Sequence, residues 1–183
     1  MKRIKFYGLG GQGAVTAAKV LSQAVSLYQN DYAITVPAYG HERRGAPVFA
    51  HIIVDQQPVL LNCFVYEPDI VLVMDDTIDA KNVDVGEGIH QDTILVLNTN
   101  NPEAIEHYRS KYGFQHIIHC DGTGIALKHI GLPIPSSAML GAFAKTGIVT
   151  IEAIEKAITD SFGKGGQKNA EAARESYNAS QNA

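Results

Sequence analysis

Cysteine is scarce in this sequence, which has only Cys63 and Cys120 among 183 residues. Two thiols so far apart predict free cysteines in a reducing, intracellular setting. A cubane iron–sulfur cluster takes about four cysteine thiolates. The chain alone therefore cannot hold one, and if its enzyme transfers single electrons, the clusters lie on another chain.

Long apolar runs and an excess of basic residues are also lacking. No stretch approaches the roughly 18–20 apolar residues of a membrane span, and the apolar run after Met1 is too short for a signal peptide. The formal net charge is -4, which argues against general nucleic-acid binding. We therefore expect a cytoplasmic protein with neither membrane nor nucleic acid as a partner. The 45% of hydrophobic residues suits one domain over residues 1–183, with a core at about 3–177.

Short apolar runs alternate with helical patterns along the chain. Strands are expected at residues 4–7, 33–36, 69–74, 93–97 and 115–120, and an extended pair at 48–54 and 58–65. Helices are expected at 14–28, 102–111, 136–146, 151–162 and 169–177, with a flexible joint at 163–166 and a loose tail. Apolar runs suit strands covered on both faces. The fold class predicted is α/β, a single Rossmann-like, mostly parallel sheet with helices on both faces and a β-hairpin extension.

Residues 8–13, Gly-Leu-Gly-Gly-Gln-Gly, follow the first strand and open a helix. Gly8, Gly10 and Gly13 fit G-x-G-x-x-G: the first permits a tight turn, the second a close ligand and the third close helix–strand packing. An anion is favoured at such a helix start. However, a nicotinamide dinucleotide site normally adds an acid at the end of the second strand, and the chain has none there. Three readings remain: the glycines only shape the turn, they hold a phosphate of another ligand, or they meet a partner's backbone.

A second glycine-flanked loop, residues 39–47, follows the second strand and contains Arg43 and Arg44. In a Rossmann-like sheet this loop lies at the same edge as the glycine loop. Two guanidinium groups suit a carboxylate or phosphate held by two bonds; the alternative is a solvated turn with weak ion pairs. His41 is a minor proton-donor candidate. The histidines show no tight metal-ligand spacing, so we expect no metal site.

Taken together, these motifs resemble the gamma subunit, or gamma domain, of thiamine-diphosphate-dependent 2-oxoacid:ferredoxin oxidoreductases. The resemblance is carried by residues 8–18, 39–48 and 139–142 and covers about residues 3–177. The sequence departs from the family pattern at His41, where Pro is common, and at Ser136, where Asn is common.

The resemblance implies a reaction in which a 2-oxoacid and coenzyme A give an acyl-CoA, carbon dioxide and two electrons for ferredoxin or flavodoxin. It implies alpha, beta and delta subunits as partners, with thiamine diphosphate, Mg and [4Fe-4S] clusters on those chains and coenzyme A as a co-substrate that this chain could contact. The Glu-Arg-Arg-Gly-Ala-Pro-Val segment resembles the pyruvate type, with 2-oxoglutarate, branched-chain and aryl 2-oxoacids as alternatives.

No residue is predicted to be catalytic, and the isolated chain is expected to be inactive. The candidate ligand- or partner-binding residues are Gly8, Gly10, Gly11, Gln12, Gly13, Tyr39, Gly40, Glu42, Arg43, Arg44 and Gly45. Two competing hypotheses are an independent coenzyme A- or nucleotide-binding module and a purely structural assembly subunit.

Overall fold

The computed structural model describes residues 1–39 and 45–183. These residues form one seven-stranded sheet in the order β2-β3-β1-β4-β5-β6-β7. The strands are β1 (Lys2–Leu9), β2 (Tyr32–Tyr39), β3 (Pro47–Asp55), β4 (Ile70–Val73), β5 (Ile94–Asn98), β6 (His116–Cys120) and β7 (Gln181–Asn182). β1, β4, β5 and β6 are parallel, whereas β2, β3 and β7 join by antiparallel pairing.

The helices have local sequence reasons for their boundaries. They are α1 (Ala14–Tyr28), α2 (Pro102–Tyr112), α3 (Gly122–Ile130), α4 (Ser136–Ala144), α5 (Ile151–Phe162) and α6 (Gly166–Ala179), with 3-10 turns η1 (Ile78–Lys81) and η2 (Gly163–Gly165). Asn101 caps α2 by accepting a hydrogen bond from the Glu103 amide, and Pro102 occupies its first position. Thr150 caps α5 through the Ala153 amide.

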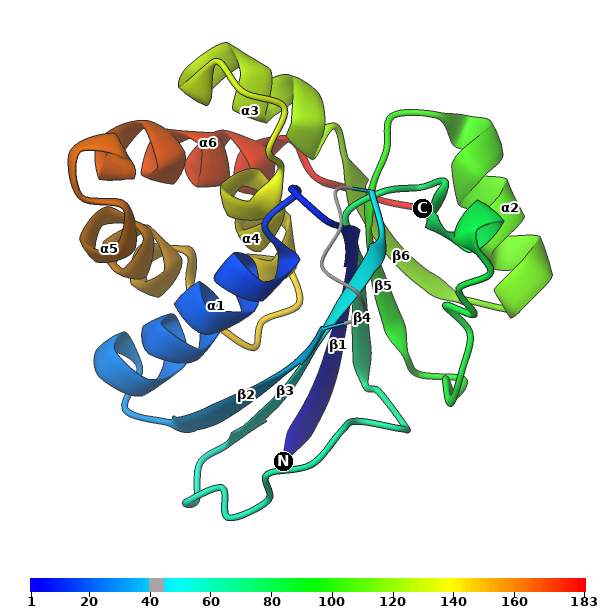
Figure 1. Cartoon of the computed structure of the whole chain (residues 1–183), viewed down its shortest axis with the longest axis horizontal. Coiled ribbons are helices and arrows are strands. Elements are labelled where there is room, and N and C mark those ends of the chain that lie inside the picture. The colour runs from blue at the N-terminus through cyan, green and yellow to red at the C-terminus, as the bar shows by residue number, and fades with distance from the viewer. Residues whose placement is uncertain (40–44) are drawn as a thin grey trace.

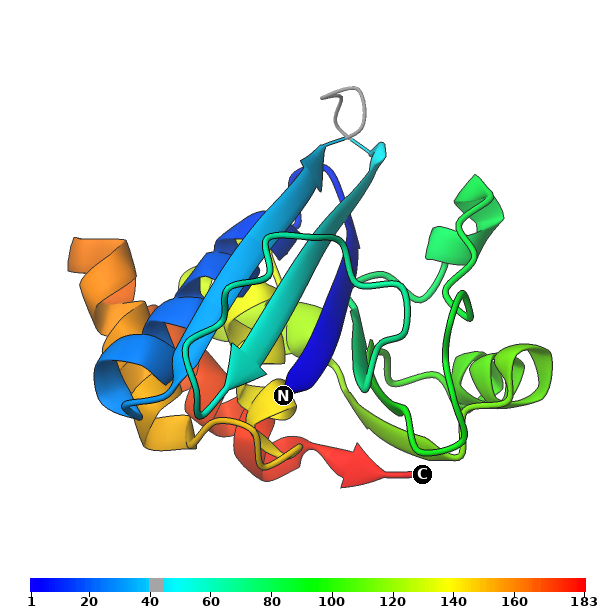
Figure 2. The same cartoon turned by 90° about the horizontal axis from the view of Figure 1, so that it is seen from below.

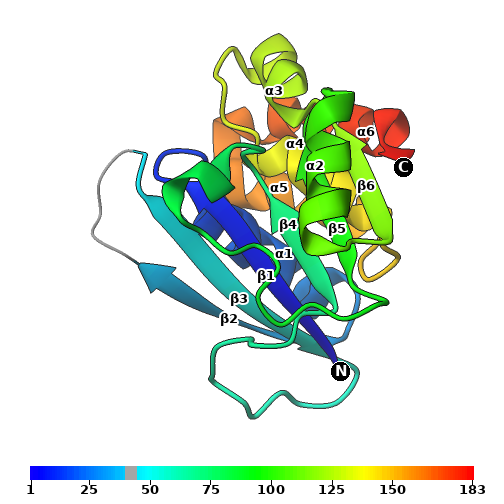
Figure 3. The ribbon, with the colours of Figure 1, turned by 90° about the vertical axis from the view of Figure 1, so that its right-hand side faces the viewer.

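Helices cover both faces of the sheet, but unequally (Figure 1). The larger hydrophobic core lies between the sheet and α1, α4, α5 and α6, and it includes Met139, Leu140, Ala142, Phe143 and Ala144 of α4. The smaller core lies on the opposite face, under η1 and α2. Figure 3 views the molecule from the α2 side, with α1 behind the sheet.

The α/β fold class with a parallel core is confirmed, but the hairpin is not where the sequence placed it. The expected pairing of residues 48–54 with 58–65 is wrong: β3 pairs with β2, and residues 58–65 are in no strand. The apolar run of residues 58–65 resembles a strand, yet both edges of β3 are already occupied by β1 and β2. Pro37 is tolerated in β2 because that strand lies at the sheet edge.

Three smaller expectations also fail. α3 was not expected, because Gly122 and Gly124 mask its start; Asp121 caps it by accepting from the Gly124 amide at 2.7 Å. The joint at 163–166 is a 3-10 turn that leads directly into α6. The tail is not loose at its end, since β7 pairs with β6 and the Ala183 amide donates to the Ile117 carbonyl at 2.9 Å.

Candidate functional site

Gln12 braces the turn between β1 and α1. Its side-chain Oε1 accepts a hydrogen bond from the Leu9 backbone amide at 2.7 Å. The backbone amide of Gln12 donates to the Leu9 carbonyl at 3.0 Å. Its Nε2 donates to Oδ2 of Asp75, just after β4, at 2.7 Å. The glycine loop is thus tied to the neighbouring parallel strand by one side chain.

The glycines of this turn meet steric and conformational demands. Gly11 and Gly13 have positive φ angles of 101° and 82°, a region that residues with a Cβ adopt at a cost. A Cβ on Gly13 would also lie 2.8 Å from the Cβ of Ser136, at the start of α4. The third glycine of the motif therefore allows α1 to pack closely against another helix, α4, and not against a strand as expected.

The glycine loop and the hairpin loop meet at the carboxyl end of β1 (Figure 2). The Gly10 amide donates to the Ala46 carbonyl at 2.8 Å, and the Gly45 amide donates to the Gly10 carbonyl at 3.2 Å. We call this junction, residues 8–13 with 39 and 45–46, the loop junction. The two loops adjoin because β2 and β3 form a hairpin beside β1, and not through a parallel crossover as the sequence argument assumed.

Several of the candidate residues lie outside this description. Gly8, Gly10, Gly11, Gln12, Gly13 and Gly45 are all placed at the loop junction, and the backbone of Tyr39 pairs with Val48 at the end of β2. Gly40, His41, Glu42, Arg43 and Arg44 lie outside the described residues. The junction that would carry the two arginines is therefore described, whereas the arginines are not.

The crevice at the carboxyl ends of the parallel strands is lined with carboxylates, a feature that the sequence argument missed. It is a cavity of about 380 Å³ bordered by Gln12, Asp75, Asp76, Asn98, Thr99 and Asp121, among others. Asp76 accepts a hydrogen bond from the Thr99 hydroxyl at 2.6 Å. In open α/β sheets a dinucleotide pyrophosphate binds at this edge, and negative charges there oppose it. Asp75 and Asp76 follow a predicted strand directly, so the strand-end rule could have found them.

No side chain among the described residues caps the N-terminus of α1. The first amides of a helix have no partner within it and carry partial positive charge. At the loop junction they lie beside the hairpin loop, which bears two arginines in sequence. The junction thus presents an uncapped helix start, whereas the adjoining crevice is acidic.

A sequence model described as pyruvate ferredoxin/flavodoxin oxidoreductase matches residues 3–179. The chain belongs to this oxidoreductase family. It is a gamma-type subunit: it is 46% identical over 180 residues to "Pyruvate synthase subunit PorC" of Methanocaldococcus jannaschii, covering 97% of this chain and 96% of that protein. It is also 46% identical over 182 residues to "Pyruvate/ketoisovalerate oxidoreductases common subunit gamma" of Pyrococcus furiosus, with the same coverage.

A solved structure of the oxidoreductase family has the same fold. The chain resembles the crystal structure of pyruvate oxidoreductase subunit PORC from Thermotoga maritima with a TM-score of 0.84 and 36% sequence identity, covering 100% of this chain and 99% of that one. As a gamma subunit of the family, the chain acts as part of an oxidoreductase. None of the helices in the described residues is long and apolar enough to pass through a bilayer.

Proposed function

We propose that the chain serves a thiamine-diphosphate-dependent oxidoreductase that converts a 2-oxoacid and coenzyme A to an acyl-CoA and carbon dioxide while reducing ferredoxin or flavodoxin. The observation that carries the proposal is similarity to gamma subunits of such enzymes along nearly the whole chain. Thiamine diphosphate, when bound, supplies the carbanion chemistry. In this proposal the chain contributes by contacting coenzyme A or a partner subunit and by taking part in assembly of the complex.

Pyruvate is the proposed substrate, because the relative in M. jannaschii is a pyruvate synthase subunit. A branched-chain 2-oxoacid is the second candidate, because the P. furiosus relative is named as common to pyruvate and ketoisovalerate enzymes. One gamma subunit shared by two enzymes implies that the choice of 2-oxoacid is made by other chains. The substrate of this enzyme is therefore best assayed on the complex.

The residues of this chain do not fit the iron–sulfur cluster that such an enzyme uses. Cys63 is exposed on the loop after β3, and Cys120 is buried on β6. Across residues 1–39 and 45–183, no three His, Cys, Asp or Glu side chains are grouped so that they could hold a metal ion. We therefore propose that the [4Fe-4S] clusters, together with thiamine diphosphate and Mg, are held by alpha, beta and delta partner subunits.

The loop junction is proposed to face coenzyme A or a partner subunit. Support comes from the uncapped start of α1 and from the hydrogen bonds that hold residues 45–46 against Gly10. Amides at a helix start bind phosphate groups, and adjacent arginines hold phosphates by two bonds. The acidic crevice beside the junction makes an independent dinucleotide-binding module the weaker reading.

The proposal is tested on the purified complex with and without this chain. We expect 2-oxoacid- and coenzyme A-dependent reduction of ferredoxin by the complete complex and none by the isolated chain. Arg43→Ala and Arg44→Ala are expected to raise the apparent KM for coenzyme A in assembled complexes if the arginines hold its phosphates. Loss of assembly with an unchanged KM would instead support a docking role. Full activity of the isolated chain, or tight binding of NAD to it by calorimetry, would contradict the proposal.

A further inference from the structure

The connection between β3 and β4 exposes a run of apolar side chains. In this segment, residues 58–66, which we call the apolar loop, Leu60 is 90% exposed, Tyr66 68%, Leu61 45% and Phe64 44%. Single exposed apolar residues are ordinary, but a contiguous apolar patch marks an interaction surface. Four such side chains within seven residues therefore need a partner.

The backbone of the apolar loop, like its side chains, has few partners within the chain. No hydrogen bond joins the backbone of residues 58–64 to any other described residue. The loop is attached at its far end, where the buried Val65 donates its amide to Nδ1 of His51 at 3.2 Å. Figure 2 shows the segment running across the β2–β3 end of the sheet. Its backbone and its apolar side chains are both available to a second surface.

A cavity of about 470 Å³ lies between the apolar loop and the sheet, and we call it the aromatic cavity. Its aromatic walls are Tyr7, Phe49, His51, Phe64 and Tyr66. The Tyr7 and Phe49 rings meet edge to face with centroids 5.4 Å apart, and the Phe64 ring lies 4.7 Å from that of His51. A cavity with these walls takes an apolar or aromatic group.

Three polar groups that line the aromatic cavity, Lys5, Glu87 and His51, have partners within the chain, and Asp84 accepts a hydrogen bond from the Gly86 amide at 3.0 Å. Lys5, nearly buried, forms an ion pair with Glu87 at 3.0 Å. Burial lowers the pKa of His51, so its ring is neutral at pH 7, and its Nδ1 is occupied by the Val65 amide. The cavity therefore offers mainly apolar surface, with Asp84 as a lining carboxylate that has no ion-pair partner among the described residues.

Ion pairs also border the apolar loop where it leaves β3 and reaches β4. The N-terminal amine pairs with Asp55 at 3.2 Å, and Lys2 pairs with Asp69 at 3.6 Å. Arg3 pairs with Glu67 at 3.7 Å. An apolar centre surrounded by a polar rim is the usual anatomy of a protein–protein interface. Because the rim charges cancel in pairs, the surface suits an uncharged partner.

We propose that the apolar loop and the aromatic cavity form an interface with another subunit of the same oxidoreductase, and that the cavity receives an uncharged apolar or aromatic side chain of that subunit. Membership in a family of multisubunit oxidoreductases supplies the partner, and the exposed apolar side chains and aromatic walls define its chemistry. The proposal does not depend on what the loop junction binds. The loop junction lies at one end of β3, and the apolar loop starts from the other end.

The two cysteines of the chain provide a matched test. Cys63 lies exposed in the apolar loop, and Cys120 is buried on β6. Treatment with N-ethylmaleimide, read out by peptide mass spectrometry, is expected to modify Cys63 in the isolated chain and to spare Cys120. In the complete complex, modification of Cys63 is expected to slow at least about tenfold, because an interface centre excludes solvent.

Equal rates for Cys63 in the isolated chain and in the complex would overturn the proposal. Protection already present in the isolated chain and lost on dilution would also overturn it, since a second copy would then be the occupant. Cys120 should stay unreactive in every sample. Its modification would indicate unfolding and would be checked by the melting curve of the same sample.

Assembly gives an independent measurement. The Leu60→Ser, Tyr66→Ser double variant is expected to reduce recovery of this chain with a tagged partner subunit at least about tenfold, since few interface residues carry most of the binding energy. Leu27→Ser removes a comparably exposed leucine, 63% exposed on α1, and is expected to assemble normally. Both isolated variants should melt like the unmodified chain. Normal recovery of the double variant would contradict the proposal.

Blocking the aromatic cavity tests the second half of the proposal. Ala38 lines the cavity from β2, so Ala38→Trp should occupy the space that the partner's side chain needs, whereas Ala38→Ser leaves it open. Lower recovery with Ala38→Trp alone is expected, provided that the isolated variant retains its melting temperature. If both variants assemble equally well, the cavity receives no side chain of the partner.

Discussion

Gly13 and Gln12 show how single residues shape the turn after β1. Gly13 allows a left-handed backbone and lets Ser136 approach where a Cβ would stand. Gln12 ties the turn to Leu9 and to Asp75. Both roles are structural, and both fix the geometry of the loop junction that the partner or coenzyme would meet.

Gly13→Ala is expected to destabilise the chain more than Gly147→Ala. Each substitution forces an alanine into a positive φ, 82° and 77° respectively, which costs about 1–2 kcal/mol. Only Gly13→Ala adds a contact at 2.8 Å, since nothing lies within 4 Å of a Cβ on Gly147. Urea unfolding of both variants measures the difference in their unfolding free energies. We expect this difference to come from the contact with Ser136. Equal losses of unfolding free energy would refute this assignment.

At the scale of single residues, the sequence predicted which residue types the turn after β1 requires, but not which distant residues they contact. G-x-G-x-x-G correctly indicated a tight turn and a close packing partner at Gly13, yet that partner is Ser136, 123 positions away in a helix. The bond from Gln12 to Asp75 spans 63 positions. Local patterns determine local backbone, whereas pairs this distant depend on the strand order.

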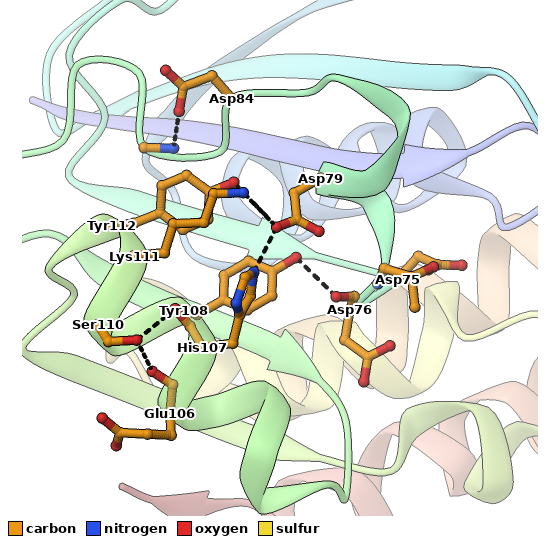
Figure 4. Close-up of polar contacts among 12 residues, drawn as sticks. Asp75, Asp76, Asp79, Asp84, Glu106, His107, Tyr108, Ser110, Lys111 and Tyr112 are labelled. Carbon is orange, nitrogen blue, oxygen red and sulfur yellow. Dashed lines mark hydrogen bonds and ion pairs between the residues drawn. The ribbon is translucent and has the colours of Figure 1, made fainter.

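At the scale of elements, α2 is fastened to η1 by one carboxylate. Asp79 accepts hydrogen bonds from His107 Nε2 at 2.6 Å and from Lys111 Nζ at 2.8 Å, and Tyr112 lies within 3.4 Å (Figure 4). Burial by itself raises the pKa of Asp79, but the hydrogen bonds from Lys111 and His107 outweigh it and lower that pKa. The same contact raises the pKa of Lys111 to about 12.

Asp79→Asn is expected to reduce the free energy of unfolding at pH 7 by about 1 kcal/mol, because it removes the carboxylate charge that holds the half-exposed Lys111 and His107 side chains. The folded pKa of Asp79 lies below its ordinary value of 3.8. Its contribution is therefore full above about pH 4 and is lost as the pH falls through the lower folded value. The two proteins should converge in stability in that acid range.

Urea titrations at pH 7, 5, 4, 3 and 2.5 would measure this convergence. Glu106→Gln removes an exposed partner of Arg109 and serves as the control, with a change within about 0.5 kcal/mol at every pH. A constant gap between Asp79→Asn and the unmodified chain down to pH 2.5 would show that ionisation of Asp79 does not contribute.

Helices and strands were predictable where the pattern that indicates them lies within their own residues. The expected helix at 14–28 is α1 to the residue, because its apolar spacing is regular. The hairpin was assigned to the wrong pair because the apolar run of residues 58–65 resembles a strand, although most of its residues lie on the surface. The same segment is the apolar loop, whose exposed hydrophobic residues the interface proposed above would cover. A pattern inconsistent with the isolated fold thus carries information about assembly.

At the scale of the whole molecule, the sheet is covered by two layers of unequal depth. α4 is buried at all nine of its residues, between the sheet and α6. α2, on the other face, buries only Ile105 and Tyr108 of its eleven. Since the stability of an element depends on the apolar contacts it would lose on opening, the two layers should open separately.

Hydrogen exchange of the isolated chain is expected to show α2 opening at a lower free energy than α4, because only two residues of α2 are buried and Asp79 provides its main polar anchor. Mass spectrometry of peptides covering 102–112 and 136–144 would measure it. Asp79→Asn should accelerate exchange in α2 while leaving α4 unchanged, since α4 lies across the sheet. Equal protection of the two helices, or equal acceleration by the variant, would mean that the chain opens as one cooperative unit and that the weaker layer does not act alone.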